Sequence, residues 1–315
     1  MKKINVYILT GFLGAGKTTI LNQLLKTFGN QRNVVIENEF GKVNIDARLI
    51  AQKVEAVFEL TNGCICCSLD EELYDTITEI YAKREVLDNL FIETTGIADV
   101  RSIAAIFKRA DIAKGFDLKV VICVVDSVII EERLQEAQET ALQVVGSDVI
   151  YFNKTQTIDE DRLVKLRGIL GSINPLAKFA IHQELTVDFL ENFEKNVEKN
   201  LVFEHKFSFE NPHKINNVLF ETEDIFKYME LYHVLNTTLL LYFHQIFRIK
   251  GFVKCTTGVC YEVQSTGQEL TFSPLDIDIE KSQMVFIGMG LKTDTVTRIL
   301  RPAIVKNTLK IRQSA

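Results

Sequence analysis

The sequence predicts an α/β protein with a doubly wound, mostly parallel sheet, followed by a second, smaller α+β domain. Three observations predict this fold. Strand-length apolar runs alternate with segments of helical period through the first 200 residues, a glycine-rich turn joins the first run to the first helical segment, and longer alternating strands follow. The 315 residues, 47% hydrophobic and 25% charged, suit about two folded domains and exclude a disordered chain.

The first domain is expected to span residues 1–200. Its predicted strands are short apolar runs bounded by turn-forming residues: Ile4–Leu9, Val34–Ile36, Ala56–Leu60, Leu90–Ile92, Lys119–Val125, Val149–Phe152 and Lys178–Ile181. Its predicted helices have apolar residues at helical spacing: Lys17–Phe28, Asp70–Lys83, Ile130–Gln143 and Asp159–Leu170. In such a sheet, functional residues gather at the carboxyl ends of the strands.

The second domain is expected to span residues 201–315, after the acidic, amphipathic segment Val187–Asn200. Its predicted strands are longer and alternate in polarity: Phe203–Phe209, Ile246–Val253, Gly258–Gln264 and Met284–Ile287. Two helices are expected, near Thr222–Leu241 and Thr293–Leu300.

Composition excludes two classes of partner. The net charge is −6, most of the acidic excess lies before residue 200, and the chain lacks the broad positive field that attracts nucleic acid. No apolar stretch reaches the roughly 20 residues that span a bilayer. The apolar start, Ile4–Phe12, mimics a signal peptide, but its removal would destroy the glycine-rich turn. We therefore expect a cytoplasmic protein with no nucleic-acid or membrane partner.

The glycine-rich turn fits the phosphate-binding pattern GxxxxGK[ST] between a predicted strand and a predicted helix. Backbone N–H groups of such a loop wrap a phosphate, and the helix N-terminus adds a favourable dipole. Lys17 is expected to reach the β- and γ-phosphates, the Thr18 hydroxyl to bind Mg²⁺, and Thr19 to support the α-phosphate. The expected nucleotide-binding residues of this loop are Gly11, Gly14, Ala15, Gly16, Lys17, Thr18 and Thr19.

A second magnesium-binding residue is expected where the strand Leu90–Ile92 ends. Glu93 follows this strand, and the N–H of Gly96 is a candidate contact for the γ-phosphate. An acid after a strand is often only a turn residue, but the phosphate-binding loop favours the functional interpretation.

The strand Val149–Phe152 is followed by Asn153 and Lys154, where guanine-specific proteins carry an NKxD motif. In that motif the aspartate accepts two hydrogen bonds from guanine. Gln156 stands in its place, which should cost about 1–3 kcal/mol of guanine preference. GTP is expected as substrate, selectivity over ATP stays open, and an unspecialised loop is the alternative.

Three of the six cysteines, Cys64, Cys66 and Cys67, follow Gly63 in a CxCC pattern. Three thiolates on one bent loop suit a soft or borderline cation such as Zn²⁺ and leave its fourth position open for exchange. A redox thiol group or three small buried residues are the alternatives. Cys123 is expected in the core. Cys255 and Cys260 are expected to pack around a hairpin turn, with a second thiol site as the alternative.

The segment after the second strand holds two further candidates, Glu37 and Glu39. Either could complete the metal site or help to position the attacking water, although acidic side chains in loops are often simply solvated. The candidate catalytic residues are therefore Lys17, Glu39 and Glu93.

Together, the segments GFLGAGKTT, ENEFG, TNGCICCSL, IETTG and the later NK resemble the CobW-type family of metal-chaperone P-loop GTPases. The segments Arg248–Phe252 and Val285–Gly288 resemble that family's C-terminal domain. The resemblance implies a GTPase that uses GTP and Mg²⁺, loads a metal on the CxCC loop, and hands it to a client metalloprotein. It implies Zn²⁺ as the metal, with Co²⁺ as a second candidate, and leaves a homodimer open.

Two residues and one absent segment depart from the family pattern. Gln156 weakens the guanine assignment, and Lys42 stands where many relatives carry an acid. The histidine-rich stretch of many relatives is absent, which favours delivery or sensing over storage. A redox-regulated nucleotide switch that carries no metal is the alternative function, and a small-molecule hydrolase is a third.

Overall fold

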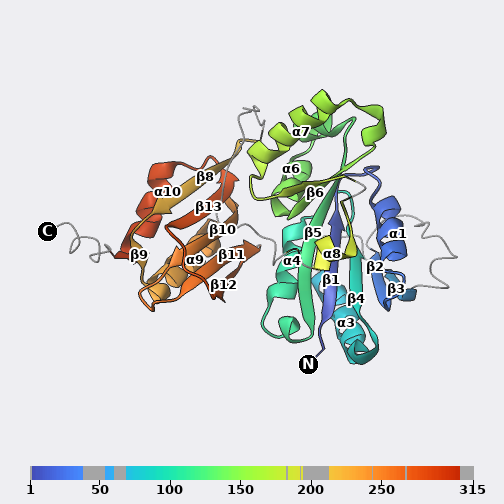
Figure 1. Cartoon of the computed structure of the whole chain (residues 1–315), viewed down its shortest axis with the longest axis horizontal. Coiled ribbons are helices and arrows are strands. Elements are labelled where there is room, and N and C mark those ends of the chain that lie inside the picture. The colour runs from blue at the N-terminus through green and yellow to red at the C-terminus, as the bar shows by residue number, and fades with distance from the viewer. Residues whose placement is uncertain are drawn as a thin grey trace. The chain divides into compact units, whose positions relative to one another are not determined.

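The computed structural model describes eight ranges of the chain: residues 2–37, 54–59, 69–181, 184–191, 193, 213–242, 244–266 and 268–305. The chain divides into two compact units, one of Met1–Arg167 with Ala177–Val197 and the other of Gly168–Leu176 with Glu198–Ala315. The boundary expected at residue 200 lies outside the described residues. Figure 1 labels most of the elements of both units.

The first unit is built on a seven-stranded sheet with the order β3-β2-β4-β1-β5-β6-β7. All pairs in this sheet are parallel. The strands are β1 (Ile4–Thr10), β2 (Asn33–Glu37), β3 (Val54–Glu59), β4 (Asn89–Glu93), β5 (Phe116–Asp126), β6 (Val149–Asn153) and β7 (Lys178–Ala180). The helices are α1 (Lys17–Thr27), α3 (Leu69–Ala82), α4 (Val100–Lys108), α5 (Ile130–Glu136), α6 (Gln138–Gly146) and α8 (Val187–Glu191). Helix α7 (Glu160–Ile173) begins in this unit, and its residues from Gly168 onward belong to the second. The predicted fold class is confirmed.

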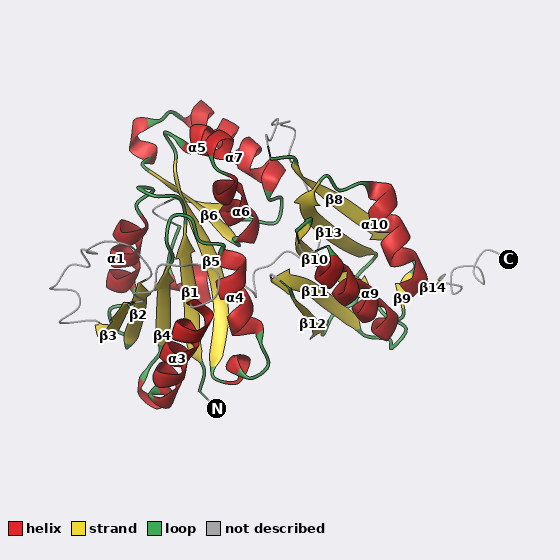
Figure 2. Ribbon diagram, turned by 180° about the vertical axis from the view of Figure 1, so that it is seen from behind, coloured by secondary structure: helices red, strands yellow, loops and turns green. Residues whose placement is uncertain are grey.

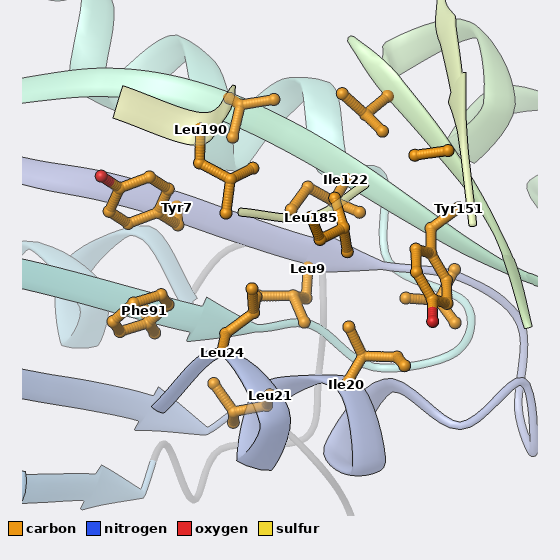
Figure 3. Close-up of a cluster of buried hydrophobic side chains, with 14 of the residues drawn as sticks. Tyr7, Leu9, Ile20, Leu21, Leu24, Phe91, Ile122, Tyr151, Leu185 and Leu190 are labelled. Carbon is orange, nitrogen blue, oxygen red and sulfur yellow. The ribbon is translucent and has the colours of Figure 1, made fainter. Parts of the chain in front are cut away.

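Two apolar layers enclose this sheet, because successive residues of each strand point to opposite faces. On one face, Tyr7 and Leu9 of β1 pack with Leu21 and Leu24 of α1 and Leu190 of α8 (Figure 3). On the other face, β1, β2 and β4 pack against α3 and α4. Helices on both faces fix the strands, so the loops at their carboxyl ends are held on a rigid frame.

The second unit contains a five-stranded antiparallel sheet with the order β12-β11-β10-β13-β8 (Figure 2). Its strands are β8 (Ile215–Thr222), β10 (Ile246–Lys254), β11 (Cys260–Thr266), β12 (Glu269–Leu275) and β13 (Ser282–Met289). Helices α9 (Tyr228–Leu241) and α10 (Thr293–Leu300) pack their apolar residues against it. Strands β9 (Ile225–Phe226) and β14 (Ile304–Val305) form a separate pair.

Several predicted elements were wrong in detail. The helix predicted over Ile130–Gln143 is two helices, because Ala137 is extended with φ −131° and ψ 118°. The helix predicted from Thr222 begins at Tyr228, because the preceding residues form the ends of β8 and β9. Residues Phe203–Phe209 lie outside the described part. In the ranges that the structure describes, no helix is both long and apolar enough to cross a membrane.

Candidate phosphate-binding site and strand-end carboxylates

The phosphate-binding loop joins β1 to α1 and adopts a backbone that only glycine permits at two positions. Gly11 has φ +138°, and a Cβ there would lie 2.1 Å from the carbonyl oxygen of Val124. Gly16 has φ +97°, and a Cβ there would lie 2.3 Å from Nδ2 of Asn153. Side chains at these positions would clash with β5 and β6, so the glycines let the loop close over the sheet edge.

Lys17 opens α1 and is buried, with 4% of its surface exposed. Its Nζ donates a hydrogen bond to the carbonyl oxygen of Gly11 at 3.1 Å, so the side chain folds back across its own loop. Ala15 is buried beneath the loop, whereas Gly14 and Thr19 are exposed. A buried ammonium group held at the inner rim of a glycine loop is suited to bind a phosphate oxygen.

Thr18 and Glu93 are brought together from α1 and β4. The Thr18 hydroxyl donates to Oε1 of Glu93 at 2.8 Å, and only 1% of Glu93 is exposed. A hydroxyl and a carboxylate are the hard oxygen donors that Mg²⁺ prefers, so these two residues fit the expected ion.

Gly96 lies on the loop after β4 and contacts the phosphate-binding loop. A Cβ on Gly96 would lie 2.6 Å from the backbone nitrogen of Leu13. On its other side, the carbonyl oxygen of Gly96 accepts a hydrogen bond from Nε2 of Gln143 at 3.0 Å. Gln143 was missed as a site residue, although a glutamine within a largely apolar segment was visible in the sequence.

Asn153, the last residue of β6, and Lys154, which follows it, both contact the phosphate-binding loop. Nδ2 of Asn153 donates to the carbonyl oxygen of Ala15 at 2.8 Å, and Nζ of Lys154 donates to that of Gly14 at 3.2 Å. Lys154 Nζ also lies 2.6 Å from Oδ2 of Asp126, a residue that sequence reasoning missed. Gln156 is exposed, in the short 3-10 helix Thr155–Thr157. The lysine therefore joins the loop to the end of β5.

Glu37 ends β2 and is buried, with 4% of its surface exposed. It is in register with Glu93 of β4 on one side and with Glu59 of β3 on the other. Three glutamates thus occupy neighbouring strand ends. Glu39 and the cysteines Cys64, Cys66 and Cys67 lie outside the described residues, and across the described ranges no group of three His, Cys, Asp or Glu residues is arranged to hold a metal.

The other three cysteines are buried and free of disulfide bonds. Burial raises the pKa of the Cys123 thiol to about 12. Burial, with a smaller effect of the neighbouring Cys260, raises the pKa of Cys255 to about 11. The Cys260 thiol donates to Oδ1 of Asp278 at 3.7 Å. The raised pKa values make Cys123 and Cys255 poor nucleophiles and poor metal ligands at neutral pH, which agrees with a packing role for these two residues.

Family models and similar proteins both assign this chain to the same family. Residues 5–181 match the model of the CobW/HypB/UreG nucleotide-binding domain, and residues 215–304 match that of the cobalamin synthesis protein cobW C-terminal domain. The zinc chaperone YjiA of Escherichia coli is 31% identical over 313 residues, which cover 94% of this chain and 97% of YjiA. The zinc chaperone CobW of Pseudomonas aeruginosa is 33% identical over 208 residues, which cover 56% of each protein.

The solved structures agree. Zn(II)-bound YjiA GTPase from E. coli superposes with a TM-score of 0.73 at 26% identity, covering 96% of this chain and 99% of that one. A Zn(II)-bound triple mutant of YjiA, in which a glutamate and two cysteines are replaced by alanine, gives a TM-score of 0.75 at the same identity and coverage. The chain therefore belongs to the CobW family, with a CobW/HypB/UreG nucleotide-binding domain followed by a CobW C-terminal domain.

Proposed function

We propose that this protein is a GTP-binding and GTP-hydrolysing metallochaperone, which holds a transition metal at its CxCC loop and uses nucleotide turnover to deliver it to a client metalloprotein. The observation that carries this proposal is the pairing of Thr18 with Glu93 beside the buried Lys17. This arrangement supplies one cation for phosphate oxygens and two oxygen donors for Mg²⁺, which are the requirements of phosphoryl transfer.

In the proposed nucleotide site, Lys17 contacts the β- and γ-phosphates, and the N–H of Gly96 contacts the γ-phosphate. Thr18 and Glu93 would hold Mg²⁺, which supplies charge neutralisation of the phosphate oxygens when it is bound. Thr19 would support the α-phosphate, and Glu39 would help to orient the attacking water. Turnover is expected to be slow, because no arginine has been assigned to the developing charge.

The nucleobase is proposed to lie against Lys154, whose aliphatic stem would cover one face of the base. Asn153 and Lys154 support this proposal because both donate to carbonyl groups of the phosphate-binding loop, at 2.8 Å and 3.2 Å. Gln156 offers one neutral acceptor where guanine-specific proteins offer a carboxylate. We expect GTP to be preferred, but by a smaller factor than an aspartate would give.

The cargo metal is proposed to bind Cys64, Cys66 and Cys67, with a carboxylate from Glu37 or Glu39. Zn²⁺ is the first candidate and Co²⁺ the second, because both accept mixed sulfur and oxygen ligands. One finding supports this donor set: strand β3, the last described element before the cysteines, ends in register with Glu37. Zn(II)-bound YjiA supports zinc as the metal.

Coupling requires that the metal bind one nucleotide state more tightly than the other. Glu37 and Glu93 are in register on adjacent strands, so the proposed metal and magnesium ligands share one edge of the sheet. We propose that the γ-phosphate and Mg²⁺ order the segment after Glu37 into its metal-binding form, and that hydrolysis releases it.

The proposal is tested by titrating Zn²⁺ and Co²⁺ in the presence of GTP, ATP or GDP, on the wild type and on Cys66→Ala. The YjiA triple mutant is Zn(II)-bound although a glutamate and two cysteines are replaced, so zinc content alone would not test this site. Thiolate-to-cobalt charge-transfer absorption should therefore be followed, because it reports sulfur ligation directly. The expected result is one thiolate-bound metal, lost in Cys66→Ala, with tighter binding in GTP than in GDP.

Two results would contradict the proposal. Equal metal affinity with GTP and GDP would refute the coupling. Nucleotide binding with no thiolate-bound metal, in reduced protein, would support the redox-regulated switch instead.

A further inference from the structure

Helix α6 carries a buried glutamine that touches the loop after β4. Gln143 has no exposed surface, and its Nε2 donates to the carbonyl oxygen of Gly96 at 3.0 Å and to that of Ala98 at 3.5 Å. One amide group thus contacts two carbonyl groups two residues apart. The contact spans more than 40 residues of sequence, so it fixes the loop against a separate helix.

The other polar atom of this side chain, its amide oxygen, has a different environment. Oε1 of Gln143 is buried and has no hydrogen-bond partner among the described residues. Thr140, one helical turn earlier, is likewise buried with an unpartnered hydroxyl oxygen, and both side chains line a pocket that also includes Phe12 and Leu13. A buried amide with an unpaired oxygen is costly, since an apolar residue of equal size would avoid this desolvation. Packing alone therefore does not account for a glutamine at this position.

The loop held by Gln143 is in contact with the phosphate-binding loop. Gly96 is so close to Leu13 that a Cβ on Gly96 would lie 2.6 Å from the Leu13 nitrogen. The loop begins directly after Glu93 and ends at Asp99, whose side chain caps α4 by accepting from the N–H of Arg101 at 3.0 Å. Gly96 is thus confined between the phosphate-binding loop and α6, while both ends of its loop are anchored.

We propose that Gln143 is a positioning residue for the γ-phosphate contact: by holding the Gly96 and Ala98 carbonyls, it fixes the loop in the conformation that distinguishes GTP from GDP. This inference rests on the proposed function, in which the N–H of Gly96 meets the γ-phosphate. A donor that is already oriented before the nucleotide binds loses less conformational entropy on binding, so its contact contributes more to affinity. GDP has no γ-phosphate, so the affinity for GDP should not depend on the hydrogen bonds of Gln143.

The informative variant is Gln143→Met, because methionine has a similar length and volume but no N–H donor. Thr140→Val is the matched control: it changes a buried polar residue of the same helix and pocket to its apolar isostere and breaks no described side-chain hydrogen bond. Affinities for GDP and for a non-hydrolysable GTP analogue are measured with Mg²⁺ on full-length protein. Amide hydrogen exchange of residues 94–99 is measured without nucleotide.

In Gln143→Met, we expect the affinity for the GTP analogue to fall about tenfold and that for GDP to change less than about twofold. Exchange of residues 94–99 should become faster, and Thr140→Val should match the wild type in all three measurements. An equal fall for both nucleotides would show a merely structural role and overturn the proposal. The proposal would also be overturned if Gln143→Met behaved like the wild type, or if the wild type bound GDP and the analogue with equal affinity.

The proposed function can fail separately. If the wild type binds neither guanine nucleotide, the proposed function is wrong, and with it the γ-phosphate role of Gln143. The exchange measurement then still decides whether Gln143 holds the loop, because it needs no nucleotide.

Discussion

The contact between Lys154 and Asp126 gives a quantitative test of how the phosphate-binding loop is held. Nζ of Lys154 lies 2.6 Å from Oδ2 of Asp126 and also donates to the carbonyl oxygen of Gly14. The side chain of Asp126 is 9% exposed, whereas that of Lys154 is 41% exposed. The pair is therefore neither a surface ion pair nor a fully buried one, and its coupling energy should lie between those two classes.

The perturbation is Lys154→Met, which keeps the aliphatic stem and removes the charge. Exposed ion pairs contribute about 0–1 kcal/mol, and loss of one partner of a buried pair costs about 3–5 kcal/mol. Asp126 keeps one hydrogen bond, from the N–H of Val128 at 3.0 Å, so we expect an intermediate loss of about 1–3 kcal/mol of unfolding free energy. Loss of the Gly14 contact should also weaken GDP binding by about tenfold.

A double-mutant cycle with Asp126→Asn measures the pair itself. We expect a coupling energy of about 1–2 kcal/mol in urea unfolding, and the exposed pair of Lys83 and Glu79 should give only about 0.3–0.5 kcal/mol as a control. If the effects of Lys154→Met and Asp126→Asn add within about 0.3 kcal/mol, the pair is not coupled and the reasoning from burial is wrong.

Three further predictions follow from single contacts. Glu93→Gln keeps an acceptor for the Thr18 hydroxyl but removes the charge, so half-maximal GTP hydrolysis should need at least about tenfold more Mg²⁺. GDP binding in the absence of Mg²⁺ should be unchanged. An unaltered Mg²⁺ dependence would exclude Glu93 as a magnesium-binding residue. Gly11→Ala places a Cβ 2.1 Å from the Val124 oxygen and should lower the free energy of unfolding by at least about 3 kcal/mol. Gly258 is also at positive φ but has nothing within 4 Å of such a Cβ, so Gly258→Ala should lower it by only about 1 kcal/mol. Similar losses of stability in the two variants would contradict this reasoning. Burial alone would raise the pKa of Asp88, but hydrogen bonds from Lys2 and Arg32 outweigh it and lower the pKa to about 2. Asp88→Asn should therefore cost about 1–2 kcal/mol at pH 7, and its difference from the wild type should shrink as pH falls from about 5 and disappear near pH 1, below both pKa values. A difference that does not shrink over this range would contradict this assignment.

Local patterns predicted the strands of the first unit but not all of its helices: α4 and α8 were missed, and α5 and α6 were predicted as one helix. The strands are runs with apolar cores, and the glycines of the phosphate-binding loop stand between a strand and a helix. Burial on both faces makes such runs almost continuously apolar, which separates them from the amphipathic helices. The order of the strands and the approach of Thr18 to Glu93 could therefore be predicted from one sequence.

Elements defined by distant partners were missed. Strand β9 is two residues long and exists because Ile304 and Val305 pair with it from the end of the second unit. Asp126 ends a strand that looked complete at Val125, and its role depends on Lys154, which directly follows the next strand in the chain. Local periodicity carries no information on such pairings, so the structure alone brings these residues together.

The register of Glu37 with Glu93 has an electrostatic consequence. Neighbouring strands lie about 4.8 Å apart, and residues in register point to the same face, so the backbone ladder sets the spacing of these two carboxylates. Two divalent cations held at such a spacing would repel each other strongly, well within one Debye length. On the proposed assignments, the negative charge of the γ-phosphate would add to that of the ligands in offsetting this repulsion, so departure of that phosphate would weaken the binding of both cations.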